Sequence, residues 1–377
     1  MRIRKAGSRP EWTKLAVFVG AWRTGSSRVA GVGEVEGSFY PRVQDREHEH
    51  CRLLSHRVVD CFMGSFNTVV VIANPSARSG RNGRVLASLA HAVEAAFPRV
   101  VFRATERPGH ARDIAAETGS SADLVLACGG DGTVHEVAEG LVSSGSTVPM
   151  GVLGMGSGND FARALHMPSS WPAALDSLVD ARTEAVDTGR LTWQEAGSLH
   201  DGFFVNALGI GFDAHSAVIA PKYKGYPFDL GYTLAILHAL RTWESGHAVV
   251  RDGTNQGAIL YRGRLMFVTV GNASDSGGGY TVNPGALIAD GYLDPCIVEG
   301  ISALRCMMLL PRVRSGRHIK MKEVRYQRAR SLHIETDDGL PIHADGEILS
   351  TEARDIQVDI NPGSLHVAVP KNAPRLS

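Results

Sequence analysis

A cluster of glycines, one carboxylate and a helix start follows the apolar run Leu124–Cys128. Residues 129–136 read Gly-Gly-Asp-Gly-Thr-Val-His-Glu. The glycines at 129, 130 and 132 permit positive φ and let a ligand lie against bare backbone. The N–H groups of the turn and of the following helix start favour an anion such as phosphate. Asp131 stands where a carboxylate could hold a metal ion or a ribose. A turn that needs glycine only for its geometry is the alternative.

A second glycine turn follows the predicted strand Pro149–Leu153. It reads Gly-Met-Gly-Ser-Gly-Asn-Asp over residues 154–160 and precedes an apolar-periodic helix. Asn159 and Asp160 are good residues for capping that helix. Capping does not explain why Gly156, Ser157 and Gly158 come before them.

A third turn lies upstream, after the β-branched strand Thr68–Ala73. It reads Asn-Pro-Ser-Ala-Arg-Ser-Gly over residues 74–80 and leads to a helix near Arg84–Phe97. Its small hydroxyls and guanidinium groups suit an anionic ligand, and they belong to Ser76, Ser79, Arg78 and Arg81. Taken by itself, a strand that ends in Asn-Pro is only a turn.

The three turns occur in a strand-turn-helix order that implies a largely parallel sheet. Another strand, Val100–Thr105, leads into a predicted helix at His110–Thr118 and ends at the same edge. In such sheets ligands bind beyond the carboxyl ends of the strands. The sequence therefore predicts a nucleotide phosphate site at this edge.

Six spaced motifs resemble those of the diacylglycerol kinase catalytic domain. This family includes bacterial soluble lipid kinases, and sphingosine and ceramide kinases are its relatives. The matching segments are Asn74-Pro75 with Ser79-Gly80, Gly129–Thr133 with Glu136, Gly156–Arg163, Phe204–Asp213, Gly277–Leu293 and Asp345-Gly-Glu347. The resemblance covers about residues 66–370. Gly-Gly-Asp-Gly-Thr alone also occurs in NAD kinases and phosphofructokinases.

Two positions depart from the family pattern. His135 stands where the helix after the first turn usually carries Asn, and Ser157 stands where Thr is usual. Ser157 keeps the hydroxyl, and neither change removes a carboxylate. We therefore expect the activity of the family.

The resemblance implies an ATP- and Mg²⁺-dependent kinase that phosphorylates a lipid hydroxyl. Phosphoryl transfer needs positioned phosphates, neutralised charge and a base for the attacking hydroxyl. The residues implied at the nucleotide are Asn74, Ser76, Ser79, Gly80, Arg81, Thr105, Gly129, Gly130, Asp131, Gly132, Thr133, Val134, His135, Glu136, Gly156, Ser157, Gly158 and Asn159.

Three carboxylates are the predicted catalytic residues. Asp131 and Asp160 lie at the same sheet edge, where they could organise metal-bound phosphates or waters. By resemblance, Glu347 is the general base. A carboxylate does this well when burial raises its pKa towards working pH. The alternative for Asp345-Gly-Glu347 is a β-turn with exposed acids.

Asp290-Gly-Tyr-Leu293 is also turn-like, and a tight hairpin is its ordinary interpretation. The resemblance instead implies a structural Mg²⁺, held by the Asp290 carboxylate and the backbone carbonyls of Leu287 and Tyr292. Oxygen ligands of this kind suit Mg²⁺.

The chain has 377 residues with 39 basic and 39 acidic side chains. This length allows two domains, and the balanced charge gives no field that would recruit nucleic acid. No run approaches the ~18 apolar residues of a transmembrane helix, so a lipid substrate would be lifted from the membrane surface. Five dispersed cysteines indicate reduced thiols. We expect a cytoplasmic protein that visits the inner membrane surface transiently.

Four segments are predicted. Residues 1–65 read as a disordered or loosely attached extension, with translation from Met63 as an alternative. Residues 66–190 form an α/β nucleotide-binding domain, with a parallel sheet like that of NAD kinase and phosphofructokinase. Residues 191–345 form a mainly antiparallel, sandwich-like lipid-substrate domain, with strands predicted at Phe203–Ala207, Ala258–Leu260, Arg264–Gly271 and Leu293–Glu299. Residues 346–377, with closing strands at Ile356–Ile360 and Leu365–Val369, return to the first domain by resemblance.

The stretch Arg305–Arg330 holds nine Lys or Arg residues and one acid, Glu323. It is either a solvated basic face or a face that rests on anionic lipid head groups. The expected partner is a membrane lipid of the diacylglycerol type, and a homodimer is one assembly open to the protein. The alternatives are a soluble-substrate kinase of the NAD kinase type and a non-catalytic nucleotide-binding relative.

Overall fold

The computed structural model describes residues 66–75, 82–223, 226, 228–254 and 257–377. All of them belong to one compact unit, Leu54–Ser377. The predicted extension at 1–65 lies outside the described residues, as do Ser76, Arg78, Ser79, Gly80 and Arg81 of the third turn.

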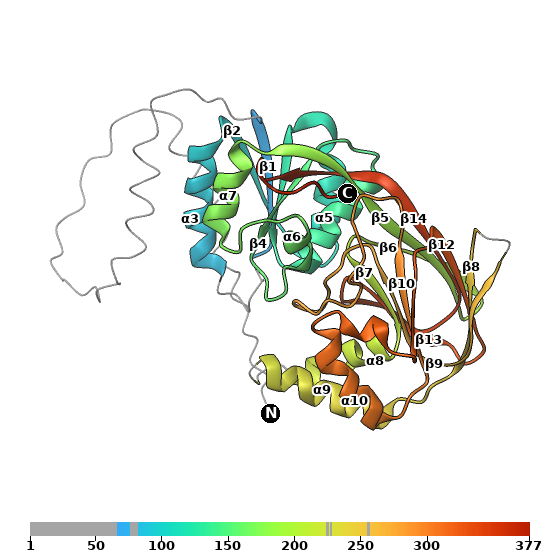
Figure 1. Ribbon diagram of the computed structural model, residues 1–377. Coiled ribbons are helices and arrows are strands. Elements are labelled where there is room, and N and C mark those ends of the chain that lie inside the picture. Colours follow the sequence, from blue (N-terminus) through green and yellow to red (C-terminus); the bar gives the residue numbers. More distant parts are fainter. Residues whose placement is uncertain (1–65, 76–81, 224–225, 227, 255–256) are drawn as a thin grey trace, which may run out of the picture. The chain divides into compact units, whose positions relative to one another are not determined.

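Four short strands form a parallel sheet in the order β2-β1-β3-β4. They are β1 (Thr68–Ala73), β2 (Arg99–Ala104), β3 (Leu124–Gly129) and β4 (Met150–Gly154). All of β3 is buried, as apolar strands are when helices cover both faces of a sheet. In Figure 1, α3 and α7 lie on one side of these strands and α5 on the other.

The helices of this part are α3 (Asn82–Ala96), α4 (His110–Thr118), the 3₁₀ turn η1 (Gly119–Ser121), α5 (Asp131–Ser143), α6 (Asp160–Ala164) and α7 (Trp171–Val179). The helix predicted at His110–Thr118 is confirmed residue for residue. Because α3, α4, α5 and α6 each follow one of these strands in the chain, the turns that lead into them gather at the carboxyl edge of the sheet.

The second part of the chain is built from long antiparallel strands. They are β5 (Arg182–Glu195), β6 (Ser198–Phe204), β7 (Ala207–Gly211), β8 (His247–Asp252), β9 (Ile259–Gly271), β10 (Asp294–Glu299), β11 (Val324–Tyr326), β12 (Ser331–Thr336), β13 (Leu340–Ala344) and β14 (Glu347–Val369). The pairings β9-β7-β13-β14-β12-β8 return to β9 and close a barrel. The predicted antiparallel second domain is confirmed.

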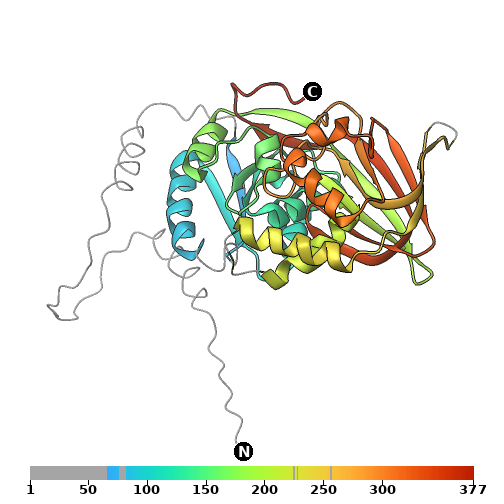
Figure 2. The ribbon, with the colours of Figure 1, turned by 60° about the horizontal axis from the view of Figure 1, so that its bottom comes forward.

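Helices cover one end of this barrel. They are α8 (Phe212–Ile219), η2 (Ala220–Tyr223), α9 (Phe228–Thr242), α10 (Ala303–Val313) and η3 (Arg317–Lys320). Figures 1 and 2 both show α9 and α10 side by side. Phe212, Ile236 and Cys306, one from each of the three α-helices, belong to a single buried apolar cluster with residues of β9, β10 and β11.

The last strand connects the two parts. β14 pairs along its length with β5, and near its end Val367 pairs in parallel with Met150 of β4. Leu365, Val367 and Val369 are buried in the same apolar cluster as β1, β3 and β4. The carboxyl end of the chain therefore completes the core of the parallel sheet.

Three predicted strand limits are wrong. The strand expected at Phe203–Ala207 is broken after Phe204, because the amides of residues 205–207 bond to a side chain and not to a neighbouring strand. The strands expected at Ala258–Leu260 and Arg264–Gly271 are one strand, β9. The two closing strands are likewise the single β14, with a register shift between Asn361 and Leu365. The predicted domain boundary at residue 190 falls inside β5.

Among the described helices, none is both long enough and apolar enough to cross a bilayer.

Candidate active site

The two glycine turns after β3 and β4 touch each other through bare backbone. A Cβ atom placed on Gly156 would lie 2.6 Å from the Cα atom of Gly130. A Cβ atom placed on Gly158 would lie 2.5 Å from Oδ2 of Asp131. Side chains are therefore excluded where the turns meet, and this contact accounts for the glycines at 156 and 158.

The glycines of the two turns do not use the positive φ that glycine permits. None of Gly129, Gly130 or Gly132 has a φ in the left-handed region, and neither have Gly156 and Gly158. Positive φ occurs instead at Asn159, at 54°. Close approach of neighbouring groups requires glycine here. Gly129, for example, packs against the side chain of Thr133.

The carboxylate of Asp131 holds the second turn in place. Its Oδ1 accepts the N–H of Asp160 at 2.7 Å, and its Oδ2 accepts the N–H of Asn159 at 2.8 Å. The sequence suggested that the side chain of Asn159 caps α6, but it makes no capping hydrogen bond to that helix. Its Oδ1 instead accepts the N–H of Gly156 at 2.8 Å. Asp131 thus fixes the relative position of the two turns.

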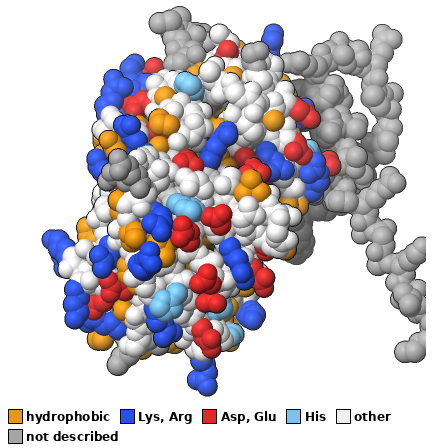
Figure 3. Space-filling model, turned by 90° about the vertical axis from the view of Figure 1, so that its right-hand side faces the viewer, with side chains coloured by type: hydrophobic (Ala, Val, Ile, Leu, Met, Phe, Trp, Pro, Cys, Tyr) orange, Lys and Arg blue, Asp and Glu red, His pale blue; other side chains and the backbone are white. Residues whose placement is uncertain are grey.

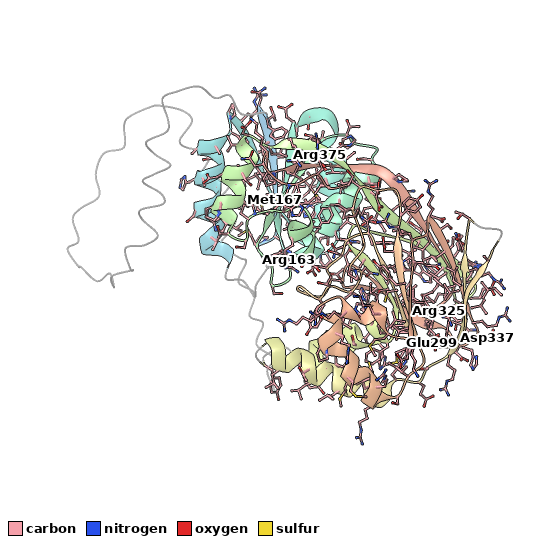
Figure 4. The ribbon with its side chains drawn as sticks, viewed as in Figure 1. Arg163, Met167, Glu299, Arg325, Asp337 and Arg375 are labelled. Carbon is pink, nitrogen blue, oxygen red and sulfur yellow. The ribbon has the colours of Figure 1, made fainter. Side chains whose placement is uncertain are left out.

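Asp160 is buried and joins this edge to the barrel part. Its carboxylate accepts the N–H of Gly278 at 3.0 and 3.1 Å and forms an ion pair with Arg163, which is labelled in Figure 4. Burial raises the pKa of Asp160, and the negative charge of Asp131 adds to the rise, although Gly278 and Arg163 oppose it. Two acids therefore lie side by side at the sheet edge.

Several predicted nucleotide residues use their side chains inside the protein. The Nδ2 of Asn74 donates to Oγ1 of Thr133 at 3.3 Å, and Val134 is buried in the core. Glu136 accepts the N–H groups of Gly109 at 2.8 Å and Ala111 at 3.0 Å, so it caps α4. Because these side chains are engaged within the protein, the groups left for a nucleotide are those of the backbone.

Thr105 lies at the same edge, and its N–H donates to the carbonyl of Ala73 at 2.9 Å. The contact of Thr105 and of the residues above with a nucleotide stays a prediction.

Glu347 reaches the same edge from the barrel. A Cβ atom on Gly132 would lie 2.9 Å from Oε1 of Glu347, so this carboxylate rests against the first turn of α5. The Glu347 side chain is exposed. The burial expected of a base is therefore not supplied by the protein alone, and a bound substrate would have to cover this carboxylate.

Asp345, two residues earlier, is an anchor that the sequence did not reveal. Its Oδ1 accepts the N–H groups of Asn206 at 2.8 Å and Ala207 at 2.9 Å. Its Oδ2 accepts the N–H of Val205 at 2.8 Å and lies 2.7 Å from Nδ1 of His135. One carboxylate thus connects α5, the break between β6 and β7, and the turn that carries Glu347.

A second pair, of which His343 is buried and Asp213 is partly exposed, stands beside this turn. The Nε2 of His343 lies 3.1 Å from Oδ2 of Asp213, and the N–H of Gly346 donates to His343 Nδ1 at 3.2 Å. The hydrogen bond and charge of Asp213 raise the pKa of His343 although burial opposes the rise. The motif match included Asp213, but no sequence spacing indicated that His343 is its partner.

A cavity of about 570 Å³ lies between these groups. Its lining includes Asp131, Ser157 and Asp160 from the sheet edge and Asp213, Tyr223 and Asp345 from the barrel part. A smaller cavity of about 90 Å³ shares Asp213, Ser216, Ser276 and Gly277 with it. The smaller cavity continues between Phe212, Ile236 and Cys306. The space is therefore acidic near the glycine turns and apolar farther into the barrel part.

The predicted metal-binding turn contains a buried carboxylate oxygen with an unused lone pair. Oδ1 of Asp290 accepts the N–H of Tyr292 at 3.0 Å, whereas Oδ2 makes no hydrogen bond, although Arg328 Nη1 lies 3.3 Å away. Asp294 is buried nearby. Burial raises its pKa, and the charge of Asp290 contributes, against a hydrogen bond from Tyr326. In the described part of the chain, no three His, Cys, Asp or Glu side chains converge on one point.

Comparisons with known proteins agree with this geometry. The family model of the diacylglycerol kinase catalytic domain matches residues 68–191, and that of the YegS C-terminal NAD kinase beta sandwich-like domain matches residues 206–369. A diacylglycerol kinase of Mycobacterium tuberculosis is 30% identical over 69% of this chain and 81% of its own length. A Pseudomonas aeruginosa protein named "Probable lipid kinase YegS-like" is 31% identical over 78% of this chain and 92% of its own length.

A solved structure has the same fold. The crystal structure of a diacylglycerol kinase from Bacillus anthracis superposes with a TM-score of 0.61 at 23% identity, covering 83% of this chain and 99% of that one. From its matches to both family models and its 30% identity to a curated relative, the chain belongs to the diacylglycerol kinase family.

Proposed function

We propose that this chain, a lipid kinase by its family membership, transfers the γ-phosphate of ATP to the hydroxyl of a membrane lipid of the diacylglycerol type. The observation that carries the proposal is the convergence of two glycine turns and three carboxylates. Asp131 and Asp160 line the larger cavity, and Glu347 follows Asp345 and Gly346 of its wall and rests against Gly132. Phosphoryl transfer requires such a meeting of a base, acids and phosphate-binding backbone.

The nucleotide would bind at the carboxyl edge of β1–β4. Here the turns present backbone N–H groups, and α5 begins at Asp131 with the positive end of its dipole towards the same edge. The side chains of Asn74, Thr133 and Glu136 hold the framework and would leave the phosphates to the backbone. Free backbone N–H groups beside a helix start suit the phosphates of a nucleotide, and this supports ATP as the phosphate donor.

Magnesium is proposed in two places, and the donor groups fit it. With the nucleotide, Mg²⁺ would neutralise the developing phosphate charge, and Asp131 and Asp160 would orient its waters. In the second place, Asp290 Oδ2 has no hydrogen bond, and buried Asp294 adds a second carboxylate nearby. Because three side-chain ligands do not converge among the described residues, that ion would also need the carbonyls of Leu287 and Tyr292.

Glu347 would take the proton from the lipid hydroxyl. It is the one catalytic carboxylate contributed by the barrel part, and it rests on the first turn of α5. A lipid that extends from the larger cavity over the turn of residues 345–347 would cover Glu347 and exclude water. The apolar smaller cavity is then suited to part of an acyl chain.

A membrane surface is the proposed source of this lipid. Apolar side chains are exposed on the paired helices α9 and α10, namely Leu230, Leu237, Met307 and Met308. The segment from Arg312 to Lys322 carries five basic residues and no acid. By contrast, the face drawn in Figure 3 intersperses both charge signs. An apolar surface next to basic residues suits anionic lipid head groups, and the inner surface of the cell membrane is the proposed location.

The test supplies radiolabelled ATP and Mg²⁺ with vesicles of several hydroxyl-bearing lipids, and separately with NAD. We expect label in a lipid of the diacylglycerol type. The Glu347→Gln variant should leave that lipid unlabelled in a matched reaction. Label on NAD instead, or ATP binding without transfer to any lipid, would overturn the proposal in favour of a soluble-substrate kinase or a non-catalytic relative.

A further inference from the structure

His135 is the position where the first glycine turn departs from the family pattern, and it faces the base-bearing turn. It lies on α5, one turn after Asp131, and is buried. Its Nδ1 is 2.7 Å from Oδ2 of Asp345, and its ring meets Phe203 edge-on with centroids 5.7 Å apart. The hydrogen bond to Asp345 and the contact with Phe203 together fix the orientation of the imidazole ring.

The hydrogen bond from His135 is the one link of its kind between α5 and the turn of residues 345–347 in the part of the chain that the structure describes. Asp345 holds the other side of the connection by accepting the amides of residues 205–207. Asp345 and Gly346 have φ values of 50° and 92°, and an Asp-Gly turn between two paired strands favours positive φ at both positions. The turn therefore keeps its shape by local preference, and the hydrogen bonds of Asp345 set where the turn lies relative to α5.

We propose that His135 is a positioning residue for phosphoryl transfer, which through Asp345 holds Glu347 against the first turn of α5. The proposal rests on the proposed function, because it assumes that Glu347 acts as the base. Loss of the bond would release the turn from α5 and let the Glu347 carboxylate move away from Gly132. Small displacements of a base matter because the reacting atoms must lie within about 3–3.5 Å of each other.

The charges around His135 are all acidic. Asp345 accepts its hydrogen bond, Glu139 lies one turn further along α5, and Glu347 faces it from the barrel part. Burial by itself lowers the pKa of His135, but the hydrogen bond and charge of Asp345, helped by Glu139 and Glu347, raise it overall. A protonated imidazole then binds Asp345 more strongly than the neutral Asn usual at this position could.

The direction of the pH effect follows from this raised pKa. The ion pair stabilises the fold fully below the ordinary His pKa of about 6.5 and is lost as pH rises through the raised value. Turnover and melting temperature should therefore both decline on the alkaline side.

The experiment compares His135→Ala and His135→Asn with the wild type in the vesicle assay. We expect His135→Ala to lose about tenfold or more in kcat with little change in KM for ATP. Asn places its amide near the position of Nδ1, so His135→Asn should regain most of kcat at neutral pH. It should lack the alkaline decline, because Asn does not titrate. The exposed pair His333–Asp355 provides a control, and His333→Ala should keep the wild-type profile.

Three outcomes would overturn the proposal. They are wild-type kcat in His135→Ala, no recovery in His135→Asn, or the same alkaline decline in His135→Asn as in the wild type. If His135→Ala does not fold, the pH profile of His135→Asn decides. If the wild type phosphorylates no lipid, the proposed function fails. The bond between His135 and Asp345 is then tested by melting: the wild type should lose more stability than His135→Asn as pH rises above about 6.5.

Discussion

The two sides of the active site are built in opposite ways. On the sheet side, the groups come from two continuous runs, residues 129–136 and 154–160, each directly after a strand. On the barrel side, they come from segments far apart in the sequence: 205–207, 213, 278 and 343–347. A phosphate-binding edge needs only backbone and small residues, which one loop can supply. A base must be carried to that edge by a separate part of the fold.

The largest expected effect tests whether the barrel side supplies the base. Glu347→Gln keeps the shape of the side chain and removes only the proton acceptor. Turnover should fall by about 10²-fold or more, with ATP affinity unchanged. The measurements are initial rates on lipid vesicles and ATP binding by calorimetry. Glu352, exposed on the same strand, is the matched control, and Glu352→Gln should turn over normally. Near-normal turnover in Glu347→Gln would contradict the assignment of Glu347 as the base.

The next effect tests whether close backbone contact explains the sheet side. A Cβ atom on Gly156 would lie 2.6 Å from the Cα of Gly130, but one on Gly130 would lie 3.4 Å from the Cα of Gly156. Gly156→Ala should therefore lower the free energy of unfolding by about 1–3 kcal/mol, as overpacking does. Gly130→Ala should lower it much less. Equal stability of the two variants in urea denaturation would show that the contact is not what selects glycine at 156.

The sheet side could be predicted from the sequence because its signals are local. Strand, turn and helix follow one another within about fifteen residues, and helix α4 was predicted to the residue. Positive φ, one of the two reasons offered for the glycines, is nevertheless not found at residues 129, 130 and 132. Whether a glycine serves positive φ or close approach depends on what packs against it. For Gly156 that neighbour is Gly130, which belongs to another loop.

The barrel side was predicted only where the family resemblance reached it. Asp345-Gly-Glu347 was recognised as a motif, but nothing local indicates that the Asp345 carboxylate accepts three consecutive amides 138–140 positions away. The same contact breaks the strand that was expected at Phe203–Ala207, since those amides are diverted from strand pairing. Side chains that terminate remote elements leave no periodic pattern in the sequence.

A smaller effect tests the proposed structural Mg²⁺ on the barrel side. Wild-type protein should melt at a higher temperature as Mg²⁺ is added without ATP, because a ligand that binds only the folded state stabilises it. Asp290→Ala should abolish that response, since it removes the carboxylate with the unbonded oxygen. Asp337, an exposed acid labelled in Figure 4, provides the control, and Asp337→Ala should respond as the wild type does. A wild type whose melting ignores Mg²⁺ would argue against an ion at this turn.

The smallest effect concerns the basic segment of the barrel part, in which some cations are paired with carboxylates and others are not. Three basic residues of the stretch predicted from Arg305 to Arg330 are paired within the barrel part: Arg305 with Glu323, Arg325 with Glu299 (labelled in Figure 4), and Arg328 with Asp290. Arg314, Arg317, Lys320 and Lys322 are exposed, and no carboxylate of the described residues lies within ion-pair distance of them. Unpaired cations are the ones available to a membrane.

Replacing these four residues by Gln should weaken binding to vesicles that contain anionic lipid, since each cation near such a surface contributes ~1 kcal/mol. ATP binding should not change, because none of these four residues lines the cavity that Asp131 and Asp160 share. Salt should weaken wild-type binding, as it screens charge over ~8–10 Å at physiological strength. The matched control removes four exposed basic residues elsewhere, Arg99, Arg190, Arg262 and Arg354, with equal loss of net charge. If both quadruple variants bind vesicles alike, overall charge and not this segment governs the contact. If neither differs from the wild type at low or high salt, the segment is only a solvated face.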